Sequence, residues 1–147
     1  MRVVIQRVLR ASVQAEGKLV GSIGKGVLVF FAVHKEDTPD KTLWLAQKLI
    51  HLRCFEDEQH KMNRSLHDIK GEILIVSQFT LYGSCLEGRR PDFIESAPPQ
   101  VARPIYDKFV AEVKRDHGQV QTGVFGAYMQ VELINDGPVT FIIDTKA

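Results

Sequence analysis

Long apolar runs and cysteines are both scarce in this sequence of 147 residues. No stretch of about 18 apolar residues occurs, which excludes a membrane-spanning helix, so no membrane partner is expected. The opening residues, MRVVIQRVLRASV, are interrupted by arginine and glutamine and lack the apolar centre of a secretory signal. With only two cysteines, Cys54 and Cys85, a disulfide framework is not expected either. We therefore predict a cytoplasmic protein whose thiols are reduced.

Charge of one sign is not in excess. The sequence has 19 lysines and arginines against 18 aspartates and glutamates, for a formal net charge of +1. Bulk electrostatic binding of nucleic acid requires a strong basic surplus, so this mode is excluded and DNA is not an expected partner. A small local patch at Arg89-Arg90 is still compatible with phosphate contacts.

Several common catalytic signatures are absent. No Gly-x-Ser-x-Gly elbow, His-Glu-x-x-His, Cys-x-x-Cys or phosphate-binding loop occurs. The five histidines show no paired metal-ligand spacing. We therefore predict no metal and no cofactor.

Strand-like and helix-like segments alternate without repeats or a linker, which at this length predicts one domain over 1–147. Apolar patterns predict strands over 3–8, 11–15, 19–23, 27–33, 72–79, 124–134 and 139–144. Thr38-Pro39 is typical of a helix start, and a second helix is predicted after Pro99. The apolar faces of the two helices are predicted at Leu43, Ala46, Leu49 and Ile50, and at Val101, Ile105, Phe109 and Val113. The fold class is α+β, with mostly antiparallel strands and two main helices.

The apolar strand over 72–79 runs into polar side chains at Ser77-Gln78-Phe79-Thr80. If the strand continued, Gln78 and Thr80 would share one face while Ser77 and Phe79 shared the other. A polar face at the end of a buried strand can line a pocket. A solvated strand edge with a threonine of high β-propensity is the alternative.

A second segment, Asn135-Asp136-Gly137-Pro138-Val139-Thr140, lies between two predicted strands. Asp-Gly in such a position is a strong hairpin signal. The proline removes an amide donor where the next strand should begin to pair. Spacing alone does not predict whether the Gly137-Pro138 bond is cis.

Together these two segments resemble the D-aminoacyl-tRNA deacylase family, and the resemblance extends over essentially the whole chain in order. Further segments that resemble the family are 1–13, 55–58 with 61–63, 88–93 and 122–131. The resemblance implies a barrel-like core and a homodimer with its active sites at the subunit interface. It also implies hydrolysis of the ester that joins a D-amino acid to the 3′ end of tRNA.

The resemblance assigns roles to particular residues. Gly137-Pro138 would form a cis dipeptide that enters the partner subunit's pocket and crowds an L-side chain, and Arg7 would brace this loop. Because exclusion acts on a side chain, glycyl-tRNA, such as glycine mischarged on tRNA(Ala), should also be a substrate. Met129 and Phe125 would form the pocket wall, with apolar core as the alternative, and Ala102 would approach the adenine.

The resemblance also implies a mechanism without a covalent intermediate. Backbone amides around Gln78 and Phe79 would form an oxyanion hole, and the 2′-hydroxyl of the substrate would help to activate water. Ser77 and Thr80 would then belong to the catalytic site as positioning groups. A threonine nucleophile would need an adjacent general base, and no histidine falls in either motif.

Two other functions stay open at this point. A Ser/Thr-nucleophile esterase acting on small molecules predicts an acyl-enzyme. A non-catalytic tRNA-binding module predicts binding without hydrolysis. Neither has a reason to carry both motifs.

Overall fold

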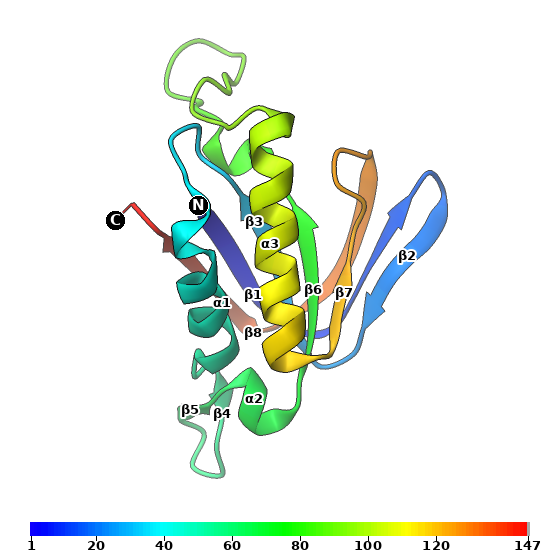
Figure 1. The fold of residues 1–147 in the computed structure, drawn as a ribbon. Helices are drawn as coiled ribbons and strands as arrows, with labels where there is room; N and C mark the ends of the chain where they lie inside the picture. Colours follow the sequence, from blue (N-terminus) through cyan, green and yellow to red (C-terminus); the bar gives the residue numbers. More distant parts are fainter. Residues whose placement is uncertain (147) are drawn as a thin grey trace.

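The long strand β1 (Arg2–Ala15) organises the sheet in the computed structural model, which describes residues 1–146 (Figure 1). On one side β1 pairs antiparallel with β3 (Gly26–Ala32) and then with β2 (Lys18–Ile23). On its other side it pairs with β8 (Met129–Asp144) along nearly its whole length. The two strands predicted over 3–8 and 11–15 are therefore one continuous strand.

The other half of the sheet is parallel. Strand β6 (Glu72–Ser77) runs beside β3, and the short strand β7 (Val120–Thr122) runs beside β6. A Cβ added to Gly21 in β2 would lie 3.0 Å from the carbonyl oxygen of Thr122, so β2 approaches β7 closely. The sheet thus curls towards a nearly closed barrel. The predicted α+β class, with a barrel-like and mostly antiparallel core, is confirmed.

Two helices cover one face of this sheet (Figure 1). They are α1 (Thr42–His51), which follows a short 3₁₀ helix η1 (Pro39–Lys41), and α3 (Pro99–His117). Phe109 of α3 stacks on Phe31 of β3 with ring centroids 4.6 Å apart. The two predicted helices are confirmed, but Leu43 and Val101 are exposed, and Leu45 and Ala102 are buried in their place.

A second apolar cluster fills the opposite face, where the sheet curls over itself. It consists of Val8, Ala11, Val13, Ile23, Leu28, Leu74 and Val76. Because both faces of β6 are buried, its sequence is a continuous apolar run instead of an alternating one. This burial fixes the position of the strand end that carries the first motif.

Smaller elements complete the described chain. Helix α2 (Leu66–Ile69) begins with a capping box formed by Ser65 and Asp68. A separate two-stranded sheet joins β4 (Phe55–Glu56) to β5 (Met62–Arg64). None of the helices within residues 1–146 has the length and apolar character needed to cross a membrane.

Strand β6 ends earlier than predicted. The chain leaves the sheet after Ser77 and forms a 3₁₀ helix, η2 (Phe79–Tyr82). The predicted alternation of faces through Thr80 is therefore wrong.

The predicted hairpin at Asp136-Gly137 is also wrong. Residues 129–144 form one strand, and 124–128 is a loop and not a strand. Gln6 pairs with Thr140 and Val8 with Asn135, so residues 136–139 stand opposite the single residue Arg7. We call residues 136–139 the β8 bulge. The bulge absorbs the turn-forming residues while β1 keeps both halves of β8 in line.

Candidate active site

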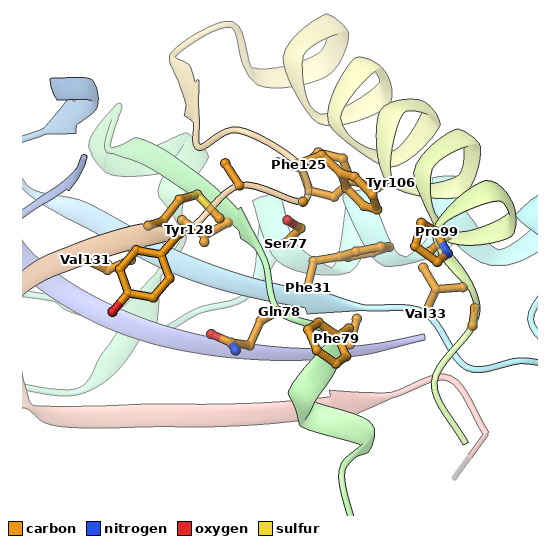
Figure 2. A pocket seen from close by; sticks show the side chains of 17 residues that line it. Phe31, Val33, Ser77, Gln78, Phe79, Pro99, Tyr106, Phe125, Tyr128 and Val131 are labelled. Carbon is orange, nitrogen blue, oxygen red and sulfur yellow. The ribbon is translucent and has the colours of Figure 1, made fainter. Parts of the chain in front are cut away.

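A cavity of about 460 Å³ opens where β6 ends, between η2, the first turns of α3 and the loop that precedes β8 (Figure 2). It is lined by Phe31, Ala32, Val33, Val76, Ser77, Gln78, Phe79, Ala97, Pro99, Ala102, Tyr106, Phe125, Gly126, Ala127, Tyr128, Met129 and Val131. The pocket is therefore mostly apolar, with a polar group at the strand end.

Six of the predicted site residues lie around this cavity. Ser77, Gln78 and Phe79 come from the end of β6 and the start of η2, and the others are Ala102, Phe125 and Met129. Thr80 does not line it. Its hydroxyl accepts a hydrogen bond from the Gln78 side-chain amide. Thr80 therefore orients Gln78 and does not face the cavity.

The main chain turns sharply at this point. The Gln78 N–H donates to the carbonyl of Phe31 at 2.8 Å, and the Gln78 carbonyl accepts from the Leu81 N–H at 3.2 Å. Of the two amides predicted as oxyanion donors, that of Gln78 is thus already engaged. The N–H groups of Phe79 and Thr80 open η2, so they have no acceptor within that helix, and no other acceptor within residues 1–146.

Aromatic side chains hold the wall opposite the strand end. The Tyr106 hydroxyl donates to the carbonyl of Ile75 at 3.2 Å. Phe125 packs against Tyr106 with ring centroids 5.5 Å apart, and the Arg103 guanidinium lies 5.8 Å from the Phe125 ring. The 123–128 loop is in this way attached to α3, and the cavity wall is fixed by packing.

None of the side chains that line the cavity carries a charge at neutral pH. Burial raises the pKa of Tyr106, so its hydroxyl stays protonated. The lining of this cavity therefore contains no carboxylate or imidazole that could deprotonate Ser77. Within residues 1–146 there is also no group of three His, Cys, Asp or Glu side chains placed to hold a metal ion.

Gly137, Pro138 and Arg7 do not line this cavity. Arg7 is buried below the β8 bulge, where Nε donates to the carbonyl of Asp136 at 3.1 Å and pairs with its carboxylate at 3.2 Å. Arg7 Nη1 donates to the carbonyl of Cys54 at 2.8 Å. Gly137 and Pro138 are exposed, and the peptide bond between them is cis.

Asn135 closes the base of the bulge. Its side-chain amide donates to the carbonyl of Arg7 at 3.1 Å and to that of Val139 at 2.9 Å. The bulge is therefore an ordered projection that presents Gly137-Pro138 to the outside of the chain.

Several lining residues were not predicted, chiefly Phe31, Ala97, Tyr106 and Tyr128. A helical pattern could have indicated Tyr106, because it follows Ala102 by one turn on α3. The others come from loops and from a neighbouring strand, where no local pattern marks them.

The curled α+β sheet and the uncharged cavity at the end of β6 define a single-domain protein with a mostly apolar pocket formed by its own chain. A family model described as D-Tyr-tRNA(Tyr) deacylase matches residues 4–144. The chain belongs to this family, which confirms the resemblance seen in the sequence.

Individual relatives agree with this assignment. A protein of Thermosipho africanus named D-aminoacyl-tRNA deacylase is 56% identical over 99% of this chain and 98% of its own length. One of the same name from Protochlamydia amoebophila is 52% identical over 99% of this chain and 96% of its own.

Solved structures share the fold over all or nearly all of the chain. A structure titled c-Myc DNA Unwinding Element Binding Protein has a TM-score of 0.93 and 40% identity, covering 100% of both chains. Another, titled as a probable eukaryotic D-amino acid tRNA deacylase, has a TM-score of 0.86 at 22% identity, covering 97% of both chains.

Proposed function

We propose that the protein hydrolyses the ester bond of D-aminoacyl-tRNA and releases the free D-amino acid and tRNA. Family membership and the names of relatives at 52–56% identity support this assignment. The observation that carries it is the position of Ser77-Gln78-Phe79 in the wall of an apolar, uncharged pocket. The pocket would receive the aminoacyl group at the tRNA 3′ end.

In the proposed reaction, water attacks the ester carbonyl and the 3′ oxygen of the ribose leaves with a proton. The negative charge that develops on the carbonyl oxygen would be stabilised by the Phe79 N–H, since the Gln78 N–H is engaged with Phe31. One such donor is worth about 3–4 kcal/mol of transition-state stabilisation. The 2′-hydroxyl of the substrate would assist the water, because the pocket lining has no basic side chain of its own.

We further propose that the active unit is a homodimer. In one chain the β8 bulge is exposed and takes no part in lining the cavity. A second copy could bring its own Gly137-Pro138 to the mouth of that cavity. The main-chain carbonyls of this dipeptide would crowd the side chain of an L-amino acid and leave room for that of a D-amino acid.

The proposed filter acts by steric exclusion of a side chain, so it also predicts whether glycyl-tRNA is hydrolysed. Glycine has hydrogen on both sides of its α-carbon and offers nothing for steric overlap. Glycyl-tRNA, including glycine mischarged on tRNA(Ala), would therefore be hydrolysed. A pocket that recognised a D-side chain positively would instead lose binding energy with glycine.

One experiment tests the activity and the filter together. D-alanyl-, glycyl- and L-alanyl-tRNA are incubated in parallel at equal enzyme concentration, and the remaining ester is followed over time. We expect hydrolysis of the first two and survival of the third. Survival of all three esters would reject the activity, whereas hydrolysis of D-alanyl-tRNA alone would reject exclusion as the filter.

The same reaction separates the two rival functions. A Ser/Thr-nucleophile esterase would leave an aminoacyl adduct on Ser77 or Thr80, which intact-mass measurement of quenched reactions detects. A non-catalytic tRNA-binding module would bind tRNA and leave every ester intact. We expect unmodified protein and released amino acid.

We place this activity in the cytoplasm, with residues 1–147 as a single functional domain.

A further inference from the structure

Ser96 contacts the active-site main chain from a distant part of the sequence. Its hydroxyl donates to the carbonyl oxygen of Phe79 at 2.9 Å. That carbonyl belongs to the peptide that joins Phe79 to Thr80. Because a peptide unit is planar, holding its oxygen also fixes the direction of the Thr80 N–H on the opposite side.

Ser96 is itself held by the segment that directly follows β3. The Lys35 N–H donates to the carbonyl of Glu95 at 3.0 Å, and the Ala97 N–H donates to that of Val33 at 2.9 Å. These two bonds lie on either side of Ser96 and form a short antiparallel bridge between His34 and Ser96. The hydroxyl is therefore presented by backbone that is tied to the central sheet.

The side chain of Glu95 strengthens this attachment. Its carboxylate accepts from Lys35 Nζ at 2.8 Å and lies 2.7 Å from His34 Nε2. The hydrogen bond from Lys35, and then that from His34, hold the pKa of Glu95 below its usual value, so the carboxylate stays charged at neutral pH. The bridge thus has both main-chain and side-chain links to residues 34–35.

The start of η2, which Ser96 contacts, has fewer restraints than its end, where Arg2 Nη1 donates to the carbonyl of Leu81 at 2.8 Å and Tyr82 is buried. Helix η2 has only four residues, and 3₁₀ hydrogen bonds are poorer than those of an α-helix. The Phe79 side chain packs edge-on against Phe93 but is 56% exposed. A fixed hydrogen bond to its carbonyl is therefore a substantial part of what holds this turn in place.

We propose that Ser96 is a positioning residue that holds the Phe79–Thr80 peptide, and with it the turn that carries the Phe79 and Thr80 N–H groups, in the conformation needed for ester hydrolysis. This inference rests on the proposed function. Ser96 acts through the main chain at the cavity and does not itself contact the substrate. Loss of the Ser96 hydroxyl should weaken stabilisation of the transition state more than binding of the substrate, because negative charge on the ester carbonyl oxygen of the substrate develops only during the reaction.

The test compares steady-state kinetics of the wild type, Ser96→Ala, Ser96→Thr and Ser84→Ala with D-tyrosyl-tRNA. Ser96→Ala should lower kcat about tenfold with KM within about twofold, the effect of one lost hydrogen bond at the reacting centre. Ser96→Thr keeps the hydroxyl in a strand-like bridge that favours β-branched residues, so it should recover most of the activity. Ser84 lies at the start of the loop between η2 and α3, the loop that also contains Ser96, and its main chain pairs with that of Asp92. Ser84→Ala should change neither kcat nor KM.

The outcomes separate this inference from the proposed function. An inactive wild type would reject the proposed function itself. An active wild type with a Ser96→Ala variant of equal kcat would reject the role of Ser96. A Ser96→Thr variant as impaired as Ser96→Ala would also reject it, because loss of the hydroxyl would then not explain the defect. Thermal unfolding of each variant, measured alongside, should show melting temperatures close to that of the wild type, and an unfolded Ser96→Ala would overturn the positioning role in favour of a structural one.

Discussion

Gly137, at the tip of the β8 bulge, has a φ of +128°, which L-side chains rarely adopt. A Cβ at this position would lie 2.6 Å from Val139 Cγ2 and 3.1 Å from Arg7 Nη2. Gly137→Ala should therefore displace the bulge, at a cost of about 1–3 kcal/mol in unfolding free energy. Deacylation of D-aminoacyl-tRNA should fall about 10- to 100-fold, since a shift of about 1 Å is enough to misplace reacting groups.

The matched control for this change is Gly24→Ala. Gly24 lies in a surface turn, where an added Cβ meets nothing within 4 Å. Both variants are compared by urea unfolding and by deacylation rate. Equal activity of Gly137→Ala and wild type would exclude the bulge from the active site.

Arg7 and Arg10 occupy the same strand but differ in burial. The Arg7 side chain is 7% exposed and donates to the carbonyls of Asp136 and Cys54. That of Arg10 is 64% exposed and pairs with Glu132 at 3.5 Å. Arg7→Met should lower the free energy of unfolding by about 2–3 kcal/mol, because it removes charged donors from the buried carbonyl of Cys54 and the partly buried carbonyl of Asp136. Arg10→Met should stay within about 0.5 kcal/mol of the wild type. Urea unfolding measures both, and equal effects would contradict a bracing role for Arg7.

At the scale of elements, the sequence predicts those helices and strands that are long enough to show a regular apolar pattern. Both main helices and the strands around Val29 and Ile75 were predicted because burial repeats along them with a clear period or as a continuous run. Strand β7 and helix α2 were missed, since elements of three or four residues are too short to show a period.

The sequence indicated the two motifs, at 77–80 and 135–140, but it did not predict their local structures correctly. Asp136-Gly137 has the composition of a hairpin turn, yet β1 pairs with β8 on both sides of it, and this long-range pairing overrides the local signal. The chain turns at Gln78 because its two main-chain groups belong to different elements. Its N–H donates to Phe31 of β3, and its carbonyl accepts the first hydrogen bond of η2, from the Leu81 N–H. The role of Ser96 depends on a contact between residues 17 positions apart, which no local pattern encodes.

The end of β8 is held to the start of β1 by an ion pair. Arg2 Nη2 lies 2.8 Å from the Asp144 carboxylate, with side-chain exposures of 36% and 18%. Burial alone would raise the pKa of Asp144, but hydrogen bonds from the Lys146 N–H and from Arg2 outweigh it and lower the pKa. Because the folded-state pKa is below the unfolded one, this contribution is present above the unfolded value and is lost as pH falls through the folded value.

In Asp144→Asn the free energy of unfolding should therefore depend less on pH below neutrality than it does in the wild type. Near neutral pH the variant should lose about 0.5–1 kcal/mol, since the pair is partly exposed. Between about pH 4 and pH 2 the difference from the wild type should shrink towards zero. Asp107→Asn is the control, because Asp107 and its partner Arg103 are both more than 60% exposed. A constant difference at all pH values would contradict the titration of Asp144.

At the scale of the whole molecule, the proposed dimer predicts that two impaired chains can restore each other's activity. Ala102→Trp would fill the cavity, and Gly137→Ala would displace the bulge. A mixed dimer has one intact cavity facing one intact bulge, so an equal mixture after subunit exchange should regain about a quarter of wild-type activity. Circular dichroism checks that each chain is folded, and mass spectrometry under native conditions checks for exchange. Exchange without recovered activity would refute a site shared between subunits.

The position of β1 between β3 and β8 has a consequence for how the protein is made. Strand β1 is synthesised well before β8, the strand that covers its second edge. At about 5–20 residues per second, about 6–23 s separate the synthesis of Ala15 from that of Met129. Throughout that interval the nascent chain carries a long unpaired strand edge, the kind of surface that promotes aggregation. The second edge of β1 can be covered only after β8 has left the ribosome, so production of this protein in cells should be sensitive to chaperones that shield nascent strands.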